Sequence, residues 1–282
     1  MLEGDAEYLS EEVLPEFTFV LTEDGKVLDS VNVKGEGTAE FKSIAFTKVG
    51  EYNYTIYENT GDEDGFTYDT TTYQVKVTVS DEGGALKAAA TVDGEATDTV
   101  EVEFVNSFEF APVTYDPPVK KVLTGDTPPK DETFEFVMEA VTEGAPMPEG
   151  TDEDGTKTVS VTGEGETEFG DMTYTAPGTY EYTIYEVAGK AARYTYDTST
   201  YTLTVDVTVE GTELVLTTTY VKNVEEEEPE LAEEAVFVNR YEKEVPPPTD
   251  ATTETRVWTG FSLATMLTAA GLMIIRRRRE EE

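Results

Sequence analysis

The chain is one segment written twice, and this duplication restricts its fold more than any other feature of the sequence. The pentapeptide YTIYE occurs at Tyr54–Glu58 and again at Tyr182–Glu186, each time after a Gly-x-Tyr lead-in. The other segments that match at the same spacing are Gly35–Phe41 with Gly163–Phe169, and Thr67–Thr70 with Thr195–Thr198. Self-similarity at one fixed spacing predicts two copies of a single structural unit.

Each copy has the pattern of an all-β domain. Apolar and polar residues alternate in runs such as Tyr73–Val79 and Tyr201–Val207, as they do in strands that bury one face. Turn-forming residues separate these runs, and the acidic stretch Val224–Glu234 predicts an exposed loop before the last strand of copy two. About seven short strands per copy predict two tandem antiparallel β-sandwiches of the immunoglobulin-like type, over residues 1–110 and 111–243.

Polar side chains interrupt the inward faces of these predicted strands. Alternation along the strand places one carboxylate inward in each copy, Glu58 and Glu186. One carboxamide also points inward in each last strand, Asn106 and Asn239, and Lys121 points inward in the first strand of copy two. Any of these groups buried alone would cost several kcal/mol, so their presence together indicates a shared role.

An amine, a carboxyl and a carboxamide in one core form a reactive set. Burial lowers the pKa of the amine and raises the pKa of the carboxyl, so a neutral lysine can meet a protonated acid. The amine then attacks the asparagine carboxamide, the acid polarises its oxygen and transfers protons, and ammonia leaves. The product is an isopeptide bond between the first and the last strand.

With this set of residues, the sequence resembles the isopeptide-linked pilin domains of Gram-positive, sortase-assembled surface proteins. The motifs that carry the resemblance are Val119–Lys121, Gly178–Glu186 and Phe237–Tyr241, and it extends over nearly all of residues 1–243.

The resemblance implies that Lys121 bonds to Asn239 with Glu186 as the catalytic acid, whereas Lys120 faces the other way. It implies a self-modifying structural protein without a cofactor, rather than an enzyme.

Copy one lacks the amine. It has Glu58 and Asn106, but no lysine precedes Phe17. Leu2–Asp5 aligns with Leu123–Asp126, which puts the missing lysine immediately before Met1. We therefore expect a chain truncated within its first strand, which also explains why no signal peptide is present. The alternative is a diverged copy that never forms the bond.

The C-terminal end resembles the family's sorting signal. Phe261–Ile275 carries no charge and is followed by four arginines. It is shorter than the ~20 residues of a comfortable membrane span, but the flanking Trp258 and snorkelling arginines can extend it. A membrane helix is therefore predicted, with a buried core helix as the alternative.

The resemblance implies that a sortase cuts between Thr259 and Gly260, although the usual Leu-Pro is absent. Residues 244–258 form a Pro/Thr linker, and residues 259–282 form the sorting signal.

The composition excludes several classes of protein. A net charge of −40 argues against nucleic acid as a partner. Without cysteine or histidine the chain has no disulfides, no common zinc site and no Ser-His or Cys-His nucleophile. The acidic turns at residues 62–65 and 152–155 lack the full series of calcium ligands, so no metal site is predicted.

Three classes of function remain. The leading hypothesis is a pilin-like or stalk subunit at the cell surface, anchored by sortase to peptidoglycan or to a neighbouring pilin subunit, with its C-terminal helix passing through the membrane. A second is an adhesin whose sandwich loops bind a host or glycan receptor. A third is a carboxylate-dependent hydrolase, which needs two acids in one open cleft, whereas Glu58 and Glu186 each sit singly in a predicted core.

Overall fold

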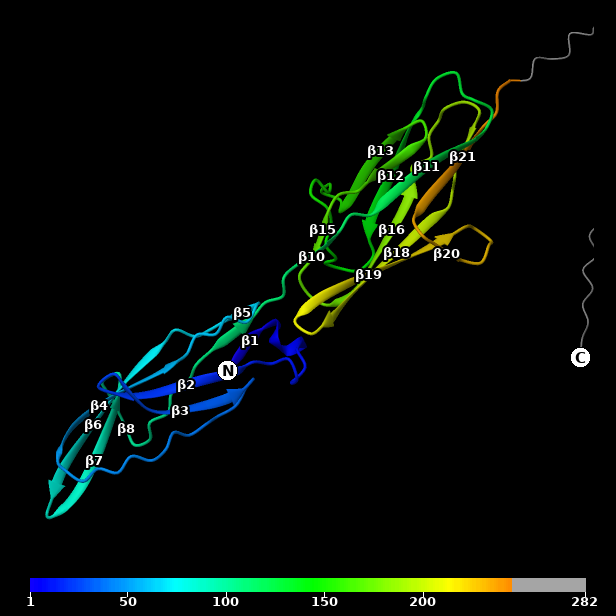
Figure 1. Ribbon diagram of the computed structural model, residues 1–282. Coiled ribbons are helices and arrows are strands. Elements are labelled where there is room, and N and C mark those ends of the chain that lie inside the picture. The colour runs from blue at the N-terminus through cyan, green and yellow to red at the C-terminus, as the bar shows by residue number, and fades with distance from the viewer. Residues whose placement is uncertain (245–282) are drawn as a thin grey trace, which may run out of the picture. The chain divides into compact units, whose positions relative to one another are not determined.

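The computed structural model describes residues 1–244 as two successive sets of β-sheets, shown in Figure 1. The first set begins with β1 (Leu2–Gly4) and ends with β9 (Asn106–Phe108). Between them lie the short 3-10 helix η1 (Asp5–Tyr8) and the strands β2 (Glu16–Glu23), β3 (Lys26–Lys34), β4 (Gly50–Glu58), β5 (Phe66–Thr67), β6 (Thr72–Glu82), β7 (Ala85–Val92) and β8 (Glu95–Thr97). They form a six-stranded sheet, β3-β2-β4-β6-β7-β8, and a three-stranded sheet, β1-β9-β5.

The second set repeats this plan with more complete sheets. Its strands are β10 (Val113–Tyr115), β11 (Pro118–Gly125), β12 (Thr133–Ala140), β13 (Thr156–Thr162), β14 (Gly165–Glu168), β15 (Met172–Tyr174), β16 (Gly178–Glu186), β17 (Tyr194–Thr195), β18 (Thr200–Glu210), β19 (Glu213–Asn223), β20 (Glu230–Ala232) and β21 (Ala235–Tyr241). The large sheet has the order β13-β12-β16-β18-β19-β20, and β14-β11-β21-β17 faces it. A small third sheet pairs β10 with β15. The all-β prediction is confirmed over the described residues.

Local sequence explains these elements. Along β16 the residues of one face, Tyr182, Ile184 and Glu186, are buried, and the residues between them are only partly so. The turn between β6 and β7 consists of Gly83 and Gly84, both with positive φ, 69° and 87°. A two-residue hairpin turn of this type requires positive φ at both positions, which glycine adopts without strain.

Two features differ from the sequence prediction. The sandwiches are not wholly antiparallel, because β11 runs parallel to β21 and β1 runs parallel to β9. A parallel pair needs a long crossover, and here the whole body of each sandwich connects the two strands. Figure 1 shows β11 and β21 side by side. The acidic stretch is also not all loop, because its residues Glu230–Ala232 form β20, which pairs with β19.

Aromatic side chains pack the two sheets of the second set together. Phe237 of β21 lies 5.2 Å, ring centre to ring centre, from both Phe136 of β12 and Tyr201 of β18. The first set repeats the arrangement around Phe104, which lies 5.0 Å from Phe19 and 5.3 Å from Tyr73. In each set the central phenylalanine precedes the inward asparagine by two residues, so the two side chains lie on the same face of the chain.

The predicted linker, sorting motif and membrane segment (residues 245–282) lie outside the described residues. Within residues 1–244, no helix is long and apolar enough to cross a membrane.

Candidate isopeptide site

Three strands of the second set bring the predicted amine, acid and amide together. Lys121 comes from β11, Glu186 from the end of β16 and Asn239 from β21. Lys121 Nζ donates to Glu186 Oε2 at 2.7 Å, and Asn239 Nδ2 donates to Glu186 Oε1 at 2.6 Å. The carboxyl group therefore bridges the amine and the amide nitrogen.

The site is closed to solvent. Lys121 is 1% exposed, Asn239 0% and Glu186 7%, with no exposure of the two charged side chains themselves. The Lys121 ammonium group also lies over the ring of Phe134, 4.6 Å from its centre. Lys120 takes the opposite direction and pairs with Glu166 at the surface.

Burial dominates the electrostatics of the pair. It lowers the pKa of Lys121, although the hydrogen bond and the charge of Glu186 act to raise it. It raises the pKa of Glu186, against the hydrogen bonds from Lys121 and Asn239. Both shifts favour the neutral amine and the neutral acid. These are the protonation states that attack by the amine requires.

The amide of Asn239 has a fixed orientation. Its Oδ1 accepts a hydrogen bond from the peptide N–H of Asp197 at 2.7 Å. Because a peptide N–H only donates, the atom facing it must be the oxygen, and the NH₂ group must face Glu186. The sequence interpretation had the acid polarising the carbonyl oxygen. In the structure Glu186 contacts the amide nitrogen, and a main-chain donor contacts the oxygen.

Asp197 belongs to the site although the sequence interpretation gave it no role. Its carboxylate accepts hydrogen bonds from the N–H of Val238 at 2.8 Å and of Ser199 at 2.9 Å. Burial acts to raise the pKa of Asp197, but these hydrogen bonds outweigh it and hold that pKa below its ordinary value. The signal that points to Asp197 in the sequence is the Thr-Tyr-Asp-Thr repeat.

The first set contains the same arrangement without the amine. Asn106 Nδ2 donates to Glu58 Oε1 at 2.8 Å, and the N–H of Asp69 donates to Asn106 Oδ1 at 2.7 Å. The Asp69 carboxylate accepts from the N–H of Val105 at 2.8 Å and of Thr71 at 2.7 Å. Each contact matches one in the second set.

The strand register shows which position in the first set is equivalent to Lys121. In the second set Lys121 lies opposite Phe237, and Leu123 lies opposite Asn239. In the first set Leu2 lies opposite Asn106, so the position equivalent to Lys121 falls directly ahead of Met1. The buried Oε2 of Glu58 has no hydrogen-bond partner within residues 1–244, whereas Oε2 of Glu186 binds Lys121.

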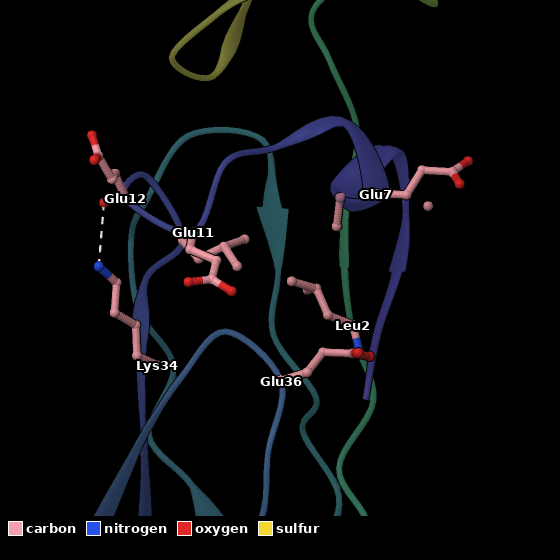
Figure 2. A pocket seen from close by; sticks show the side chains of 9 residues that line it. Leu2, Glu7, Glu11, Glu12, Lys34 and Glu36 are labelled. Carbon is pink, nitrogen blue, oxygen red and sulfur yellow. Dashed lines mark hydrogen bonds between the residues drawn. The ribbon is translucent and has the colours of Figure 1, made fainter.

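A separate pocket opens next to β1, but it is not part of either site. It has a volume of about 810 Å³, and four glutamates are among the residues that line it. Figure 2 shows Glu36 beside Leu2, and the Glu36 carboxylate accepts a hydrogen bond from the Leu2 N–H at 2.8 Å. Lys34 Nζ donates a hydrogen bond to the main-chain oxygen of Glu12 at 3.3 Å. Neither Glu58 nor Asn106 lines this pocket.

Other predicted sites lie elsewhere. The predicted sortase cleavage residues Thr259 and Gly260 lie outside the described residues. In the part of the chain that the structure describes, no group of three or more acidic, histidine or cysteine side chains is placed to hold a metal ion.

The fold and site define a class of protein: tandem β-sandwiches in which a buried acid–amide pair lies on the inward face of each sandwich and is joined by a lysine amine in the second. A family model described as the Spy0128-like isopeptide containing domain matches this chain twice, over residues 2–109 and residues 117–242. The chain belongs to this family.

Solved structures with similarity to the chain include two pilus proteins. One is the major pilin from Streptococcus pyogenes, with 17% identity and a TM-score of 0.28, covering 81% of this chain and 92% of that one. Another is the C-terminal fragment of the pilus adhesin SpaC from Lactobacillus rhamnosus GG, with 10% identity and a TM-score of 0.25, covering 82% and 90%. No curated protein matches the sequence. The family assignment rests on the two family-model matches.

Proposed function

We propose that this chain is a structural cell-surface protein of pilin-like type, made of two immunoglobulin-like sandwiches, with an isopeptide bond between Lys121 and Asn239 in the second. The observation that carries the proposal is the solvent-free contact of Lys121, Glu186 and Asn239. Membership of an isopeptide-containing family supports it. A buried lysine and glutamate are costly to a fold unless they are paired, and the proposed reaction converts the amine into an amide, which no longer ionises.

The reaction is an amide exchange that needs no outside reagent. The neutral amine of Lys121 attacks the side-chain carbonyl carbon of Asn239, and a new C–N bond forms. The bond from that carbon to Nδ2 then breaks, and Nδ2 leaves as ammonia. Glu186, which starts as the neutral acid, delivers its proton to the leaving nitrogen through Oε1 and then, as a carboxylate, takes a proton from the attacking nitrogen through Oε2, consistent with its distances of 2.6 and 2.7 Å. It ends in the protonation state in which it began.

The position of the bond suggests what it is for. It joins β11 to β21, the first and last long strands of the second sandwich, so a pulling force along the chain passes through a covalent link. Closing a loop of roughly 100 residues stabilises a fold by about 4–5 kcal/mol in the chain-entropy account. A stalk under tension benefits from both effects.

We further propose that the chain divides into sandwiches at residues 1–110 and 111–243, a linker at 244–258 and a sorting signal at 259–282. In this scheme sortase is a partner, Thr259 is joined to peptidoglycan or to a neighbouring pilin subunit, and the segment 261–275 inserts transiently into the membrane. The location is the cell surface. The motif supporting this part is Arg256–Gly260, followed by the apolar stretch and four arginines.

The test is the intact mass of the purified protein. We expect it to be one ammonia lower than the mass calculated from the sequence. Glu186→Ala should restore the full mass, and the near-isosteric Glu186→Gln should do the same with less disturbance of packing. Lys120→Ala is the matched control and should keep the loss. Full mass in the parent protein contradicts the proposal.

A further inference from the structure

A repeated turn motif contacts the inward asparagine of each sandwich. Thr-Tyr-Asp-Thr occurs at Thr67–Thr70 and Thr195–Thr198. In the second sandwich this segment begins at the last residue of β17 and precedes β18, and its aspartate lies against the strand that carries Asn239. In both sandwiches the aspartate N–H donates to the asparagine side-chain oxygen at 2.7 Å. An unrelated surface turn has no reason to repeat this contact.

The contacted oxygen is the atom on which charge develops. When an amine adds to a carboxamide, the carbonyl oxygen becomes an alkoxide. A main-chain N–H already directed at that oxygen stabilises the transition state without reorganising, and it does so most effectively where water is excluded. Asn239 is fully buried, and Glu186 is occupied with the two nitrogens. The donor to the Asn239 side-chain oxygen is therefore the peptide N–H of Asp197.

The side chain of the same residue fixes where that donor points. The Asp197 carboxylate holds the N–H of Ser199 within its own turn and the N–H of Val238 on β21. Val238 directly precedes Asn239. The carboxylate therefore ties the turn that supplies the donor to the strand that supplies the reacting group.

We propose that the peptide N–H of Asp197 is the oxyanion donor of the cross-linking reaction, and that the Asp197 carboxylate is the positioning group that holds it in line. Asp69 has the same place in the first sandwich. This inference rests on the proposed function, because it concerns the rate of the reaction proposed above.

The experiment follows the ammonia loss over time. The chain is made by cell-free synthesis, samples are quenched in denaturant at intervals, and the fraction that has lost ammonia is read from intact mass. The decisive variant replaces the peptide N–H of Asp197 by an ester oxygen, which removes the donor and keeps the carboxylate. We expect the reaction to slow by about 10²–10³-fold, the range found on removing one oxyanion donor.

Side-chain variants separate positioning from general stability. Asp197→Ala removes the acceptor for both N–H groups and should slow the reaction by about ten- to a hundredfold, as expected for losing hydrogen bonds to a charged group. Asp197→Asn keeps an acceptor and should recover much of the rate. Thr198→Ala is the matched control, because Thr198 lies in the same turn and is exposed to solvent. It should react at the parent rate.

Each outcome has one meaning. Lys121→Ala, which cannot form the bond, is the reference for the protease resistance of a folded, unlinked chain. If the ester and Asp197→Ala both react within about threefold of the parent rate, the Asp197 assignment is wrong and the proposed bond itself stands. If the ester reacts normally and only Asp197→Ala is slow, the residue stabilises the turn and donates nothing to the reaction. If the parent never loses ammonia, the proposed function fails instead.

Discussion

The two sandwiches share a plan and differ at one chemical position. Both have an inward glutamate bonded to an inward asparagine, and both hold the asparagine oxygen with an aspartate N–H. Only the second has a lysine bonded to that glutamate. There Glu186 has two donors, one on each oxygen, whereas Glu58 has one donor and a buried oxygen with no partner in the described residues.

The strands around the amine differ in the same way. In the second sandwich β11 pairs with β14 on one side and β21 on the other. In the first, the corresponding segments at residues 37–40 and 102–105 are not in strands, and β1 pairs with β9 over three residues only. The lysine and the strand that carries it therefore form one structural unit. They supply the reactive group and complete the smaller sheet together.

The largest expected difference is mechanical. If the second sandwich is cross-linked, stretching single molecules of residues 1–244 should give one extension event, from the first sandwich, because tension bypasses the covalent loop of the second. Glu186→Ala should add a second event of comparable length. Two events in the parent protein would show that the second sandwich has no brace. Limited proteolysis should cut the first sandwich before the second.

A lysine added at the equivalent position should make the first sandwich resemble the second. Extending the chain with Pro-Val-Lys-Lys directly ahead of Met1 puts an amine opposite Phe104, as Lys121 lies opposite Phe237. We expect the loss of a second ammonia and a gain of about 4–5 kcal/mol in the first sandwich, since a loop of roughly 100 residues is closed. The measurements are intact mass and the urea midpoint of that sandwich.

Two controls accompany the extension. Ending it with glutamine instead of lysine, or adding Asn106→Ala to the lysine extension, should leave the second ammonia in place. A second loss in either control would show that another pair of groups reacts. No second loss with the lysine present would mean that the Glu58–Asn106 pair is not preorganised.

The pH dependence of the first sandwich should carry the signature of Glu58. Burial raises the pKa of Glu58 above its ordinary value of 4.5, outweighing the hydrogen bond from Asn106. The folded state then binds more protons than the unfolded state, so this contribution to stability is complete below pH 4.5 and is lost as the pH rises through the folded pKa.

Glu58→Gln should remove that contribution. We expect the variant to gain stability relative to the parent as the pH rises from 4.5 towards neutral, measured as the urea midpoint of the first sandwich. Glu16→Gln, an exposed position on β2, controls for the general effect of one charge. Parallel pH curves for the parent and Glu58→Gln would contradict the burial argument.

The smallest effect should come from Lys120. Its pair with Glu166 is at the surface, where the side chains are 38% and 60% exposed, and such pairs contribute about 0–1 kcal/mol. Lys120→Ala should leave both the ammonia loss and the stability of the second sandwich nearly unchanged. If this variant abolishes the ammonia loss, the reacting amine has been assigned to the wrong lysine.

Much of the fold followed from short-range pattern. Period-two alternation placed Tyr182, Ile184 and Glu186 on one face, because side-chain direction in a strand depends only on residue parity. The parallel pairing of first and last strands did not follow, since it depends on how the intervening sheets fold back. The short strand β20 was missed because its acidic sequence has no apolar alternation, and only pairing with β19 defines it.

The side chains of the site could be predicted from the sequence, but its main-chain donor could not. Lys121, Glu186 and Asn239 stand out as polar groups on inward faces. The donor to the amide oxygen is a main-chain N–H, which every residue except proline has. No residue type marks it in the sequence. Asp197 was visible only as part of a repeated motif whose purpose required the three-dimensional contacts.

The central claim is that one covalent bond distinguishes the two sandwiches, and mass spectrometry of the protein and its digest tests it most directly. The intact chain should lack one ammonia. Proteolysis should release one branched product in which the peptide carrying Lys121 is joined to the peptide carrying Asn239, while the peptide carrying Asn106 appears unmodified. A linear peptide with an intact Asn239, or a branched product through Asn106, would contradict the account.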